Sequence, residues 1–482
     1  REHFHYIIET DTVAFTDCVN CLVAFTNSEA GSEVCLNALA FLRFCALKLA
    51  EGALGDLEET AATEKQLADG IVDVTPSKAA TTTTCFTDAE AHTYFWFPLL
   101  AGLSELTFDP RSEIRTSALE VLFDTLKFHG GSFAPGFWSR VYSRILFPIF
   151  DHVRADIAPS AIRGDGEDYE VSAADIDDWL YGACTRCLEL VVDLAVQFHE
   201  AIVEADIMPS LLDLICGLST RSHEQLAACG VVAFKRLLIN GAPLMQPKEW
   251  QQCMQALKKA FSLTTPDYDL LTTSEIDESN KSTANASLVR IKTQLLLVSA
   301  ACDLFQQVIE SRETSNADTI YVLLDVLEEV HTKAARAGRT FRERASDLTQ
   351  LAREAKPLVL AVEVSAAALA LRTLATLQAE TQERSAQLVR MMNAALENYI
   401  HTTEIVTDAD IREDAQGSAQ VVVDALEAAR ALSEATFQSN ISTTYPLLVA
   451  LIRRGSKQTE VTNALSDLFR ERVGPLLARS IP

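Results

Sequence analysis

Two pairs of cysteines have the spacing of metal-binding or redox sites. Cys18 and Cys21 form one CxxC pair, and Cys184 and Cys187 form the other. Four thiolates can hold a structural zinc ion, and a single pair can cycle through a disulfide. The two pairs of a zinc knuckle are close in sequence and lie in glycine-rich turns, and a redox pair follows a strand. Here the two pairs are far apart in sequence, and each lies within a helical pattern. We therefore expect ordinary core cysteines and no bound metal.

The nine histidines form no recognisable ligand or catalytic set. No HExxH, GxGxxG, Walker A or GxSxG pattern occurs, and Gly455-Ser456-Lys457 lacks the upstream glycine of a phosphate loop. A cysteine–histidine nucleophile is an alternative for which the sequence selects no pair. We nominate no catalytic, cofactor-binding or metal-binding residue, and we expect no cofactor.

One basic cluster interrupts an acidic background. It surrounds Gly338 and consists of Lys333, Arg336, Arg339, Arg342 and Arg344. Such a cluster can bind anionic lipid or an acidic partner. Four acidic residues fall within the same stretch, namely Glu328, Glu329, Glu343 and Asp347. Partial neutralisation therefore favours an ordinary solvated face.

A short polar break separates two helical patterns at Phe108-Asp109-Pro110-Arg111-Ser112. Asp109 has the position of an N-cap, and Pro110 that of the first helical residue, where a missing N–H costs nothing. Apolar residues recur every three or four positions on both sides of the break: Leu99, Leu103 and Leu106 before it, and Ile114, Ala118, Val121, Leu122 and Leu126 after it. The pattern predicts a helical hairpin.

This hairpin resembles a HEAT repeat. Pro98 opens its first helix, Asp109 lies in the turn, and Arg115 follows six residues later in the second helix. In HEAT proteins the Asp and Arg of neighbouring repeats tend to form a ladder. The resemblance implies a structural role for Asp109, Pro110 and Arg115.

Composition narrows the fold class and the kinds of partner. The chain has 482 residues, 48% of them hydrophobic, with few glycines and prolines and no strand-like alternation. This predicts an all-α protein too long for one compact domain unless it is a repeat array. A net charge of −26 argues against nucleic acid and against broad adhesion to anionic lipid. Eleven cysteines, mostly in apolar helical patterns, are typical of reduced core thiols in the cytosol.

We expect no transmembrane segment. The most apolar run, Pro357 to Leu371, is shorter than the roughly 20 residues that span a bilayer and is interrupted by Glu363. The N-terminus does not have the pattern of a signal peptide. The chain begins with Arg1, so we expect a fragment of a longer protein.

Residues 100–130 and 137–154 carry a closer resemblance. Their sequences, LAGLSELTFDPRSEIRTSALEVLFDTLKFHG and FWSRVYSRILFPIFDHVR, resemble the region downstream of the catalytic domain in large brefeldin-A-inhibited (BIG-type) Arf guanine-nucleotide exchange factors, in their plant or algal form. Residues 16–52 are similar to the preceding homology block of that family.

The resemblance implies a parent protein that exchanges GDP for GTP on Arf at the trans-Golgi network. It implies a region without catalytic activity of its own, which controls recruitment and autoinhibition by binding small GTPases of the Arf or Rab type or other copies of itself. We expect a cytosolic protein that associates peripherally with Golgi membranes. A general HEAT scaffold, such as a transport receptor or coat adaptor, is the alternative; an enzyme built on a helical array is a third.

We expect an α-solenoid of degenerate HEAT- or armadillo-like hairpins. The predicted organisation is a helical block at 1–51, a flexible insertion at 52–93, HEAT-like repeats at 94–263, a flexible loop at 264–287 and C-terminal helical repeats at 288–482. Within the HEAT-like segment at 94–263, an acidic, turn-rich stretch at 155–178 is expected to be a solvated connector. Pro148 and Pro357 are each expected to break or kink a helix.

Overall fold

The computed structural model describes residues 12–28, 31–50, 95–109, 111–150, 184–273, 278–311, 317–344, 348–377, 382–405, 411–454 and 458–480. Within these ranges all regular elements are helical and no strand occurs, which confirms the all-α prediction. The chain divides into two compact units, residues 1–214 and 215–482. The expected insertion at 52–93, the acidic connector at 155–178 and Pro110 lie outside the described residues.

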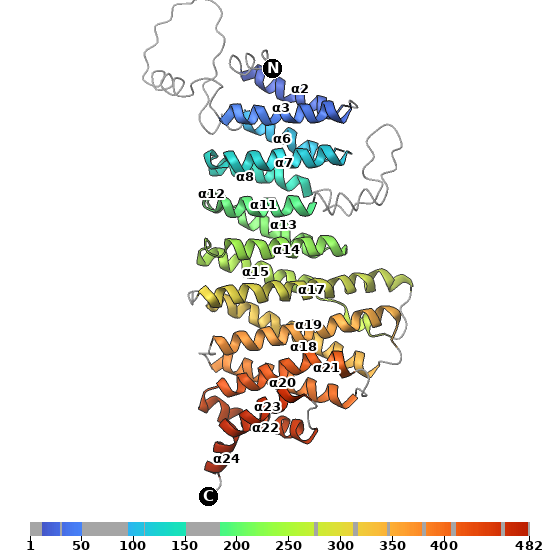
Figure 1. Ribbon diagram of the computed structural model, residues 1–482, viewed down its shortest axis with the longest axis vertical. Helices are drawn as coiled ribbons and strands as arrows, with labels where there is room; N and C mark the ends of the chain where they lie inside the picture. The colour runs from blue at the N-terminus through green and yellow to red at the C-terminus, as the bar shows by residue number, and fades with distance from the viewer. Residues whose placement is uncertain are drawn as a thin grey trace, which may run out of the picture. The chain divides into compact units, whose positions relative to one another are not determined.

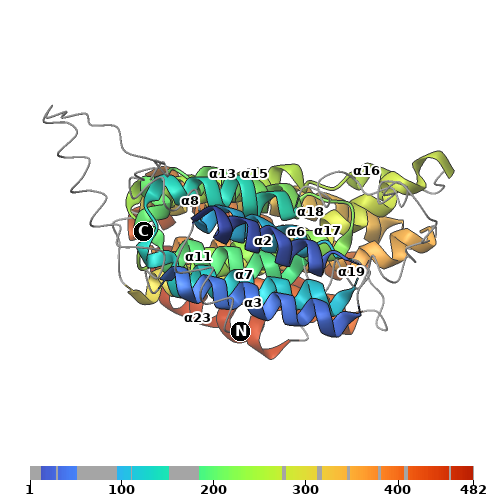
Figure 2. The same cartoon turned by 90° about the horizontal axis from the view of Figure 1, so that it is seen from above.

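The first unit is built from two layers of stacked helices. Helices α2 (Thr12–Thr26), α6 (Phe97–Leu106) and α8 (Pro135–Val141) form one layer, and α3 (Ser32–Ala50), α7 (Ser112–His129) and α11 (Thr185–Gln197) form the other (Figures 1 and 2). A 3-10 turn, η2 (Gly130–Ser132), leads from α7 towards α8. The short α12 (His199–Glu204) packs on α8, and α13 (Met208–Ser219) crosses the division between the units.

Two prolines of the first unit lie where helices begin or end, as their sequence positions predict. Pro98 occupies the first turn of α6, where a missing N–H removes no helical hydrogen bond. After α8 the chain continues as a π-helix, η3 (Tyr142–Leu146), and then as a 3-10 helix, η4 (Phe147–Phe150). The α-helix therefore gives way before Pro148, as that residue predicts.

Buried polar groups connect the first unit's helices. The Ser104 hydroxyl donates to the Ile145 carbonyl at 2.9 Å, and the Tyr142 hydroxyl donates to the Val191 carbonyl at 3.0 Å. Tyr142 is fully buried, and this burial raises the pKa of its phenol. Each bond satisfies a group that would otherwise be costly to bury.

The second unit repeats the two-layer pattern with longer helices. One layer contains α14 (Glu224–Gly241), α17 (Glu278–Ser311), α19 (Gln350–Thr376), α21 (Ile411–Ala431) and α23 (Thr459–Leu468). The other contains α15 (Pro247–Leu263), α18 (Ala317–Glu343), α20 (Gln382–Ile405) and α22 (Glu434–Arg454). The π-helix η9 (Phe469–Val473) and α24 (Gly474–Ser480) follow. In both units successive hairpins stack on one another, the arrangement of an α-solenoid.

The loop expected at 264–287 is much shorter than predicted. A single helical turn, α16 (Tyr268–Leu271), follows α15, and its start is capped by the Asp267 carboxylate, which accepts the Leu270 N–H at 3.0 Å. Helix α17 already begins at Glu278, and both Ala284 and Ser287 are fully buried. Small and polar residues occupy its core-facing positions, so hydrophobic periodicity did not reveal this helix.

Pro357 does not break a helix. The break lies earlier, between the end of α18 at Glu343 and the start of α19 at Gln350. Thr349 caps α19 by accepting the Ala352 N–H at 3.2 Å. Pro357 lies inside α19, and Pro446 likewise lies inside α22. Local propensity is overridden here by the packing of each helix against its neighbours.

Helix α19 is the central apolar helix of the second unit. It has 27 residues and a mean hydropathy of 1.8 over its most apolar window, so by length and composition alone it is comparable to a membrane span. However, 61% of that window is buried, because α17, α18, α20 and α21 all pack on it. A helix that is apolar on most sides is expected where neighbours surround it.

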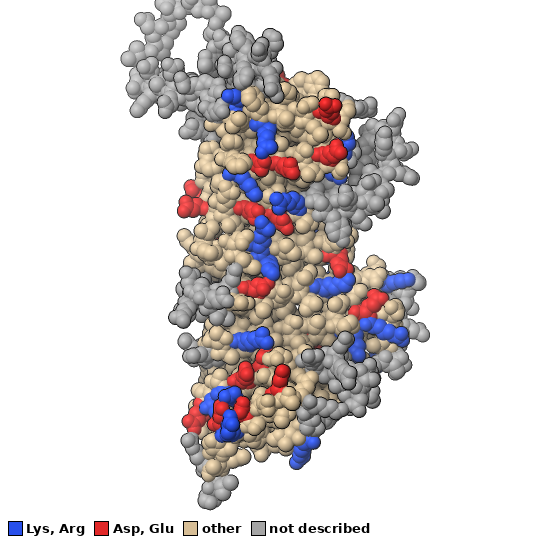
Figure 3. All heavy atoms as spheres, in the orientation of Figure 1, with Lys and Arg blue, Asp and Glu red and all other residues tan. Residues whose placement is uncertain are grey.

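Ion pairs join neighbouring helices within a layer. In the first unit Arg43 of α3 pairs with Asp124 of α7 at 2.6 Å. In the second unit Arg372 of α19 pairs with Asp424 of α21 at 2.8 Å, and Lys235 of α14 pairs with Asp303 of α17. On the face drawn in Figure 3, basic and acidic side chains gather beside one another rather than in patches of one sign. Exposed pairs add about 0–1 kcal/mol each, so they mainly neutralise the surface.

The second unit offers a direct test of close helix packing. A Cβ at Gly230 of α14 would lie 2.6 Å from both the backbone nitrogen and the hydroxyl of Ser219 in α13, whereas a Cβ at Gly217 would meet nothing within 4 Å. We expect Gly230→Ala to lower the free energy of unfolding by about 1–3 kcal/mol through overpacking. Gly217→Ala, on an exposed helical position, should raise it by up to about 1 kcal/mol. Urea denaturation measures both; a stabilising Gly230→Ala would contradict the contact.

Candidate functional site

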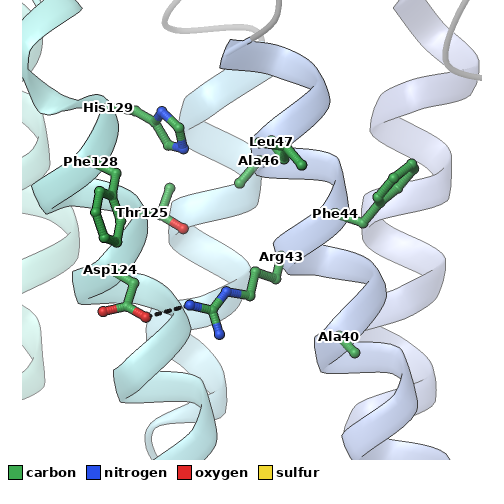
Figure 4. A pocket seen from close by; sticks show the side chains of 9 residues that line it. All are labelled: Ala40, Arg43, Phe44, Ala46, Leu47, Asp124, Thr125, Phe128 and His129. Carbon is green, nitrogen blue, oxygen red and sulfur yellow. Dashed lines mark hydrogen bonds and ion pairs between the residues drawn. The ribbon is translucent and has the colours of Figure 1, made fainter.

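A groove of about 600 Å³ lies between α3 and α7 in the first unit (Figure 4). The residues that line it are Ala40, Arg43, Phe44, Ala46 and Leu47 from α3, and Asp124, Thr125, Phe128 and His129 from α7. Clefts of 300–1,000 Å³ with mostly apolar walls are typical of binding sites.

Large apolar side chains of the groove are open to solvent. Phe128 is 76% exposed and Leu47 is 47% exposed. Phe44 is half-buried, and the Lys48 ammonium lies 5.6 Å from the centre of its ring. Adjacent exposed apolar side chains of this size are unfavourable in water and commonly mark a binding surface.

The polar side chains of the groove are electrically balanced. Arg43 and Asp124 form their ion pair at its edge, and both remain substantially exposed. Burial lowers the pKa of His129, and its ring lies 5.5 Å from the indole of Trp96. His129 is therefore neutral at pH 7, and the lining has no net charge. This composition suits an apolar partner surface with a hydrogen-bonding edge.

The only sign of this groove in the sequence is the second apolar side of α3, which does not by itself distinguish a groove from a buried helix. Residues 34–49 are apolar on more than one side of a helix, a pattern that predicts burial between neighbours. The structure buries one side, including Cys35, Leu39 and Leu42, but leaves Val34 and Leu47 exposed. The expectation of burial on all sides is therefore wrong for α3, and its second apolar side contributes to the groove.

Asp109 belongs to a second polar cluster, at the turn between α6 and α7. Its buried carboxylate accepts Arg111 Nε at 2.8 Å and Nη2 at 2.7 Å, and also the Arg111 backbone N–H at 2.9 Å. Arg111 further donates to the Thr26 carbonyl at the end of α2 at 2.6 Å, and to the Cys35 sulfur in α3 at 3.1 Å. The bond to Asp109 raises the pKa of Arg111. One guanidinium thus connects α2, α3 and the turn before α7.

Arg115, the other residue that matches the HEAT pattern, also contacts Asp109. Arg115 donates to the backbone carbonyl of Asp109 at 2.9 Å rather than to its carboxylate. Asp109 is also not the N-cap, because α7 begins at Ser112 with Arg111 in the capping position. A turn folds Arg111 back onto Asp109, which spacing along a helix does not predict. The structural role of Asp109, Pro110 and Arg115 remains a prediction.

The CxxC cysteines divide between core and surface. Cys184 and Cys187 are buried, as expected, whereas Cys18 is half-buried and Cys21 is exposed on α2. Burial raises the pKa of Cys18, which opposes formation of a reactive thiolate. Among the described residues no group of three or more His, Cys, Asp or Glu side chains is placed to hold a metal ion.

The basic cluster around Gly338 does not form one surface. Lys333 pairs with Glu329 at 2.7 Å on the outside of α18, and Arg336 and Arg339 are exposed. Arg342 is instead buried and lies 3.4 Å from the Glu363 carboxylate of α19. The prediction of a solvated face is therefore wrong for Arg342, because Gly338 lets α19 approach α18 closely.

The two arginines near Asp109 can be distinguished by stability. We expect Arg111→Ala to lower the free energy of unfolding by about 3 kcal/mol, because it leaves a buried carboxylate without its partner. Arg115→Ala removes one hydrogen bond to a carbonyl and should cost about 1 kcal/mol. Urea denaturation of the two variants measures the difference. A larger loss in Arg115→Ala than in Arg111→Ala would contradict the assignment of Arg111 as the main side-chain partner of Asp109.

Known proteins match the chain along most of its length. The family model of the BIG2 C-terminal domain matches residues 292–470, and that of the C-terminal region of Mon2 protein matches residues 47–171. The chain is also similar, at 13% identity and a TM-score of 0.31, to a circular tandem repeat protein of novel repeat topology, over 99% of this chain and 100% of that one. A score this low adds nothing to the fold assignment.

Curated relatives are exchange proteins. Brefeldin A-inhibited guanine nucleotide-exchange proteins 2 and 3 of Arabidopsis thaliana are 33% and 31% identical, over 99% and 100% of this chain. The ADP-ribosylation factor guanine nucleotide-exchange factor SEC7 of Saccharomyces cerevisiae is 24% identical over 36% of the chain and 8% of its own length. The chain spans about 30% of the length of the Arabidopsis relatives. With this identity along nearly all its residues and a C-terminal family model matched in each unit, the chain belongs to the brefeldin A-inhibited guanine nucleotide-exchange protein family as a C-terminal region.

Proposed function

We propose that the chain is a non-catalytic regulatory and recruitment region of a large Arf exchange factor, and that it binds an Arf-type GTPase through the groove between α3 and α7. The observation that supports this most is the exposure of Phe128 and Leu47 beside the Arg43–Asp124 pair. Exposed apolar side chains next to a polar edge are the usual composition of a protein interface.

The choice of an Arf-type partner rests on the relatives. They are named as guanine nucleotide-exchange proteins, one of them for ADP-ribosylation factor. A docking site outside the catalytic domain would let the bound GTPase report its own state to the exchange factor. We further propose that the parent protein acts at the trans-Golgi network, where it associates peripherally with the membrane. The same proposal includes binding of Rab-type GTPases and of other copies of the protein.

The groove can be tested by paired substitutions. We expect Phe128→Glu and Leu47→Glu each to weaken binding of Arf at least tenfold, because a charge would be buried in an apolar interface. Leu263→Glu, at a 50% exposed position in the second unit, is the matched control and should leave affinity unchanged. Calorimetric titration with GDP-loaded and GTP-analogue-loaded Arf measures this; circular dichroism checks the fold. Equal affinity of all variants, or no binding in either state, would refute the groove.

The absence of intrinsic exchange activity is a separate prediction. Purified residues 1–482 should not accelerate release of a fluorescent GDP analogue from Arf, whereas a full-length family member should do so in the same assay. An acceleration by residues 1–482 alone would show that the region is catalytic. This result is independent of whether the groove binds Arf.

A further inference from the structure

A small cavity lies where four helices of the second unit meet. Its volume is about 20 Å³, and its polar lining includes His331 of α18, Glu363 of α19, Asn398 and Thr402 of α20, and Ser418 of α21. The cavity falls within residues 292–470, which match the BIG2 C-terminal domain. Its position is separate from the groove of the first unit, and the inference that follows does not depend on the proposed function.

The Nε2 atom of His331 is buried in this core without a hydrogen-bond partner among the described residues. Its side chain is almost completely buried, and its Nδ1 lies 3.1 Å from the backbone carbonyl of Glu363. Because a carbonyl oxygen only accepts, Nδ1 must carry the hydrogen of this bond. Burial lowers the pKa of His331, so the ring is neutral at pH 7. A neutral ring with its hydrogen on Nδ1 has an acceptor at Nε2.

Asn398 contributes a second unpartnered acceptor. The residue is 6% exposed, and its Oδ1 is buried. Within the described part of the chain neither His331 Nε2 nor Asn398 Oδ1 has a hydrogen-bond partner. The Thr402 hydroxyl does not serve, because it donates to the Asn398 backbone carbonyl at 2.7 Å. Two acceptors cannot satisfy each other, and an unpaired buried acceptor is costly.

We propose that this cavity binds one water molecule, which donates one O–H to His331 Nε2 and the other to Asn398 Oδ1. A water molecule needs on the order of 10–15 Å³ of such space and two or more polar partners, so the cavity has room for one. Water also has two donors, as the two acceptors require. A cation is less suitable, because the Glu363 carboxylate already pairs with the Arg342 guanidinium.

The bound water joins two hairpins. His331 belongs to α18 and Asn398 to α20, which pack side by side in one layer, and the bond of His331 to Glu363 adds α19. The Glu363 carbonyl sets the tautomer of His331, and the water held by His331 Nε2 then favours the orientation of the Asn398 amide that presents Oδ1 to it. The water therefore acts as a structural joint between successive repeats.

A high-resolution crystal structure of the chain tests the site directly. We expect density for one water molecule within hydrogen-bonding distance of both His331 Nε2 and Asn398 Oδ1. Nitrogen-15 NMR of the imidazole should show the hydrogen on Nδ1. The proposal is overturned if the cavity is dry, if it holds an ion, or if the Asn398 amide is reversed so that Nδ2 donates directly to His331.

Coupling between the two residues provides an independent measurement. His331→Phe and Asn398→Leu each leave the water with only one of its two acceptors. The double variant removes both acceptors, so no buried acceptor remains for the water to satisfy. We expect the fold-change in the unfolding constant of the double variant to be at least threefold smaller than the product of the single fold-changes. His331→Phe combined with Thr373→Val, whose hydroxyl donates only to the Leu369 carbonyl at 2.8 Å, should be additive. If the effects of His331→Phe and Asn398→Leu on the unfolding constant are additive, the proposed bridging water is refuted.

Discussion

The structure depends on helices that carry more apolar surface than one hairpin can bury. In α19 buried residues face the helices on several sides, and most of its apolar window is covered. A single hairpin leaves half of such a surface in water, so each hairpin must stack on the next. Glycines at crossing points, such as Gly230 against Ser219, show how closely the backbones approach. The two-layer architecture of each unit follows from this requirement.

Stacking buries turns and helix ends along with apolar stripes, and the polar groups there need partners. Asp109 is satisfied by Arg111, and Glu363 lies against Arg342. Buried pairs of this kind contribute little net stability compared with apolar substitutes. Their effect is to penalise any arrangement in which the partners are separated, so they select one register between neighbouring helices. At His331 and Asn398 the two buried acceptors cannot bond to each other, and the proposed water molecule is their shared partner.

The same packing rule explains where binding is possible. On exposed faces, charged residues of neighbouring helices pair with each other, so a net charge of −26 does not produce patches of one sign on the face that is drawn. The groove between α3 and α7 departs from this pattern, since its walls are apolar and its charges cancel. Recognition there would rely on apolar contact rather than on long-range attraction, which suits a partner held through a specific fit.

Sequence patterns predicted the all-α class and the helical hairpin opened by Pro98, and resemblance to known sequences predicted the family. The fold class and the hairpin follow from periodicity along single helices, which is a local feature, whereas the family follows from the resemblance of residues 16–52, 100–130 and 137–154 to known sequences. These patterns did not predict that Asp109 pairs with Arg111, that residues 278–287 are helical, or that Pro357 lies inside a helix.

The groove was also beyond the sequence, because an apolar second side on α3 predicts either a buried helix or an open surface. Only the position of α7, which covers one side and leaves Leu47 and Phe128 exposed, decides between them. Such outcomes depend on contacts between residues that are distant along the chain, and no local pattern records them. Tertiary packing decided them because the free energy of burial depends on which surfaces meet.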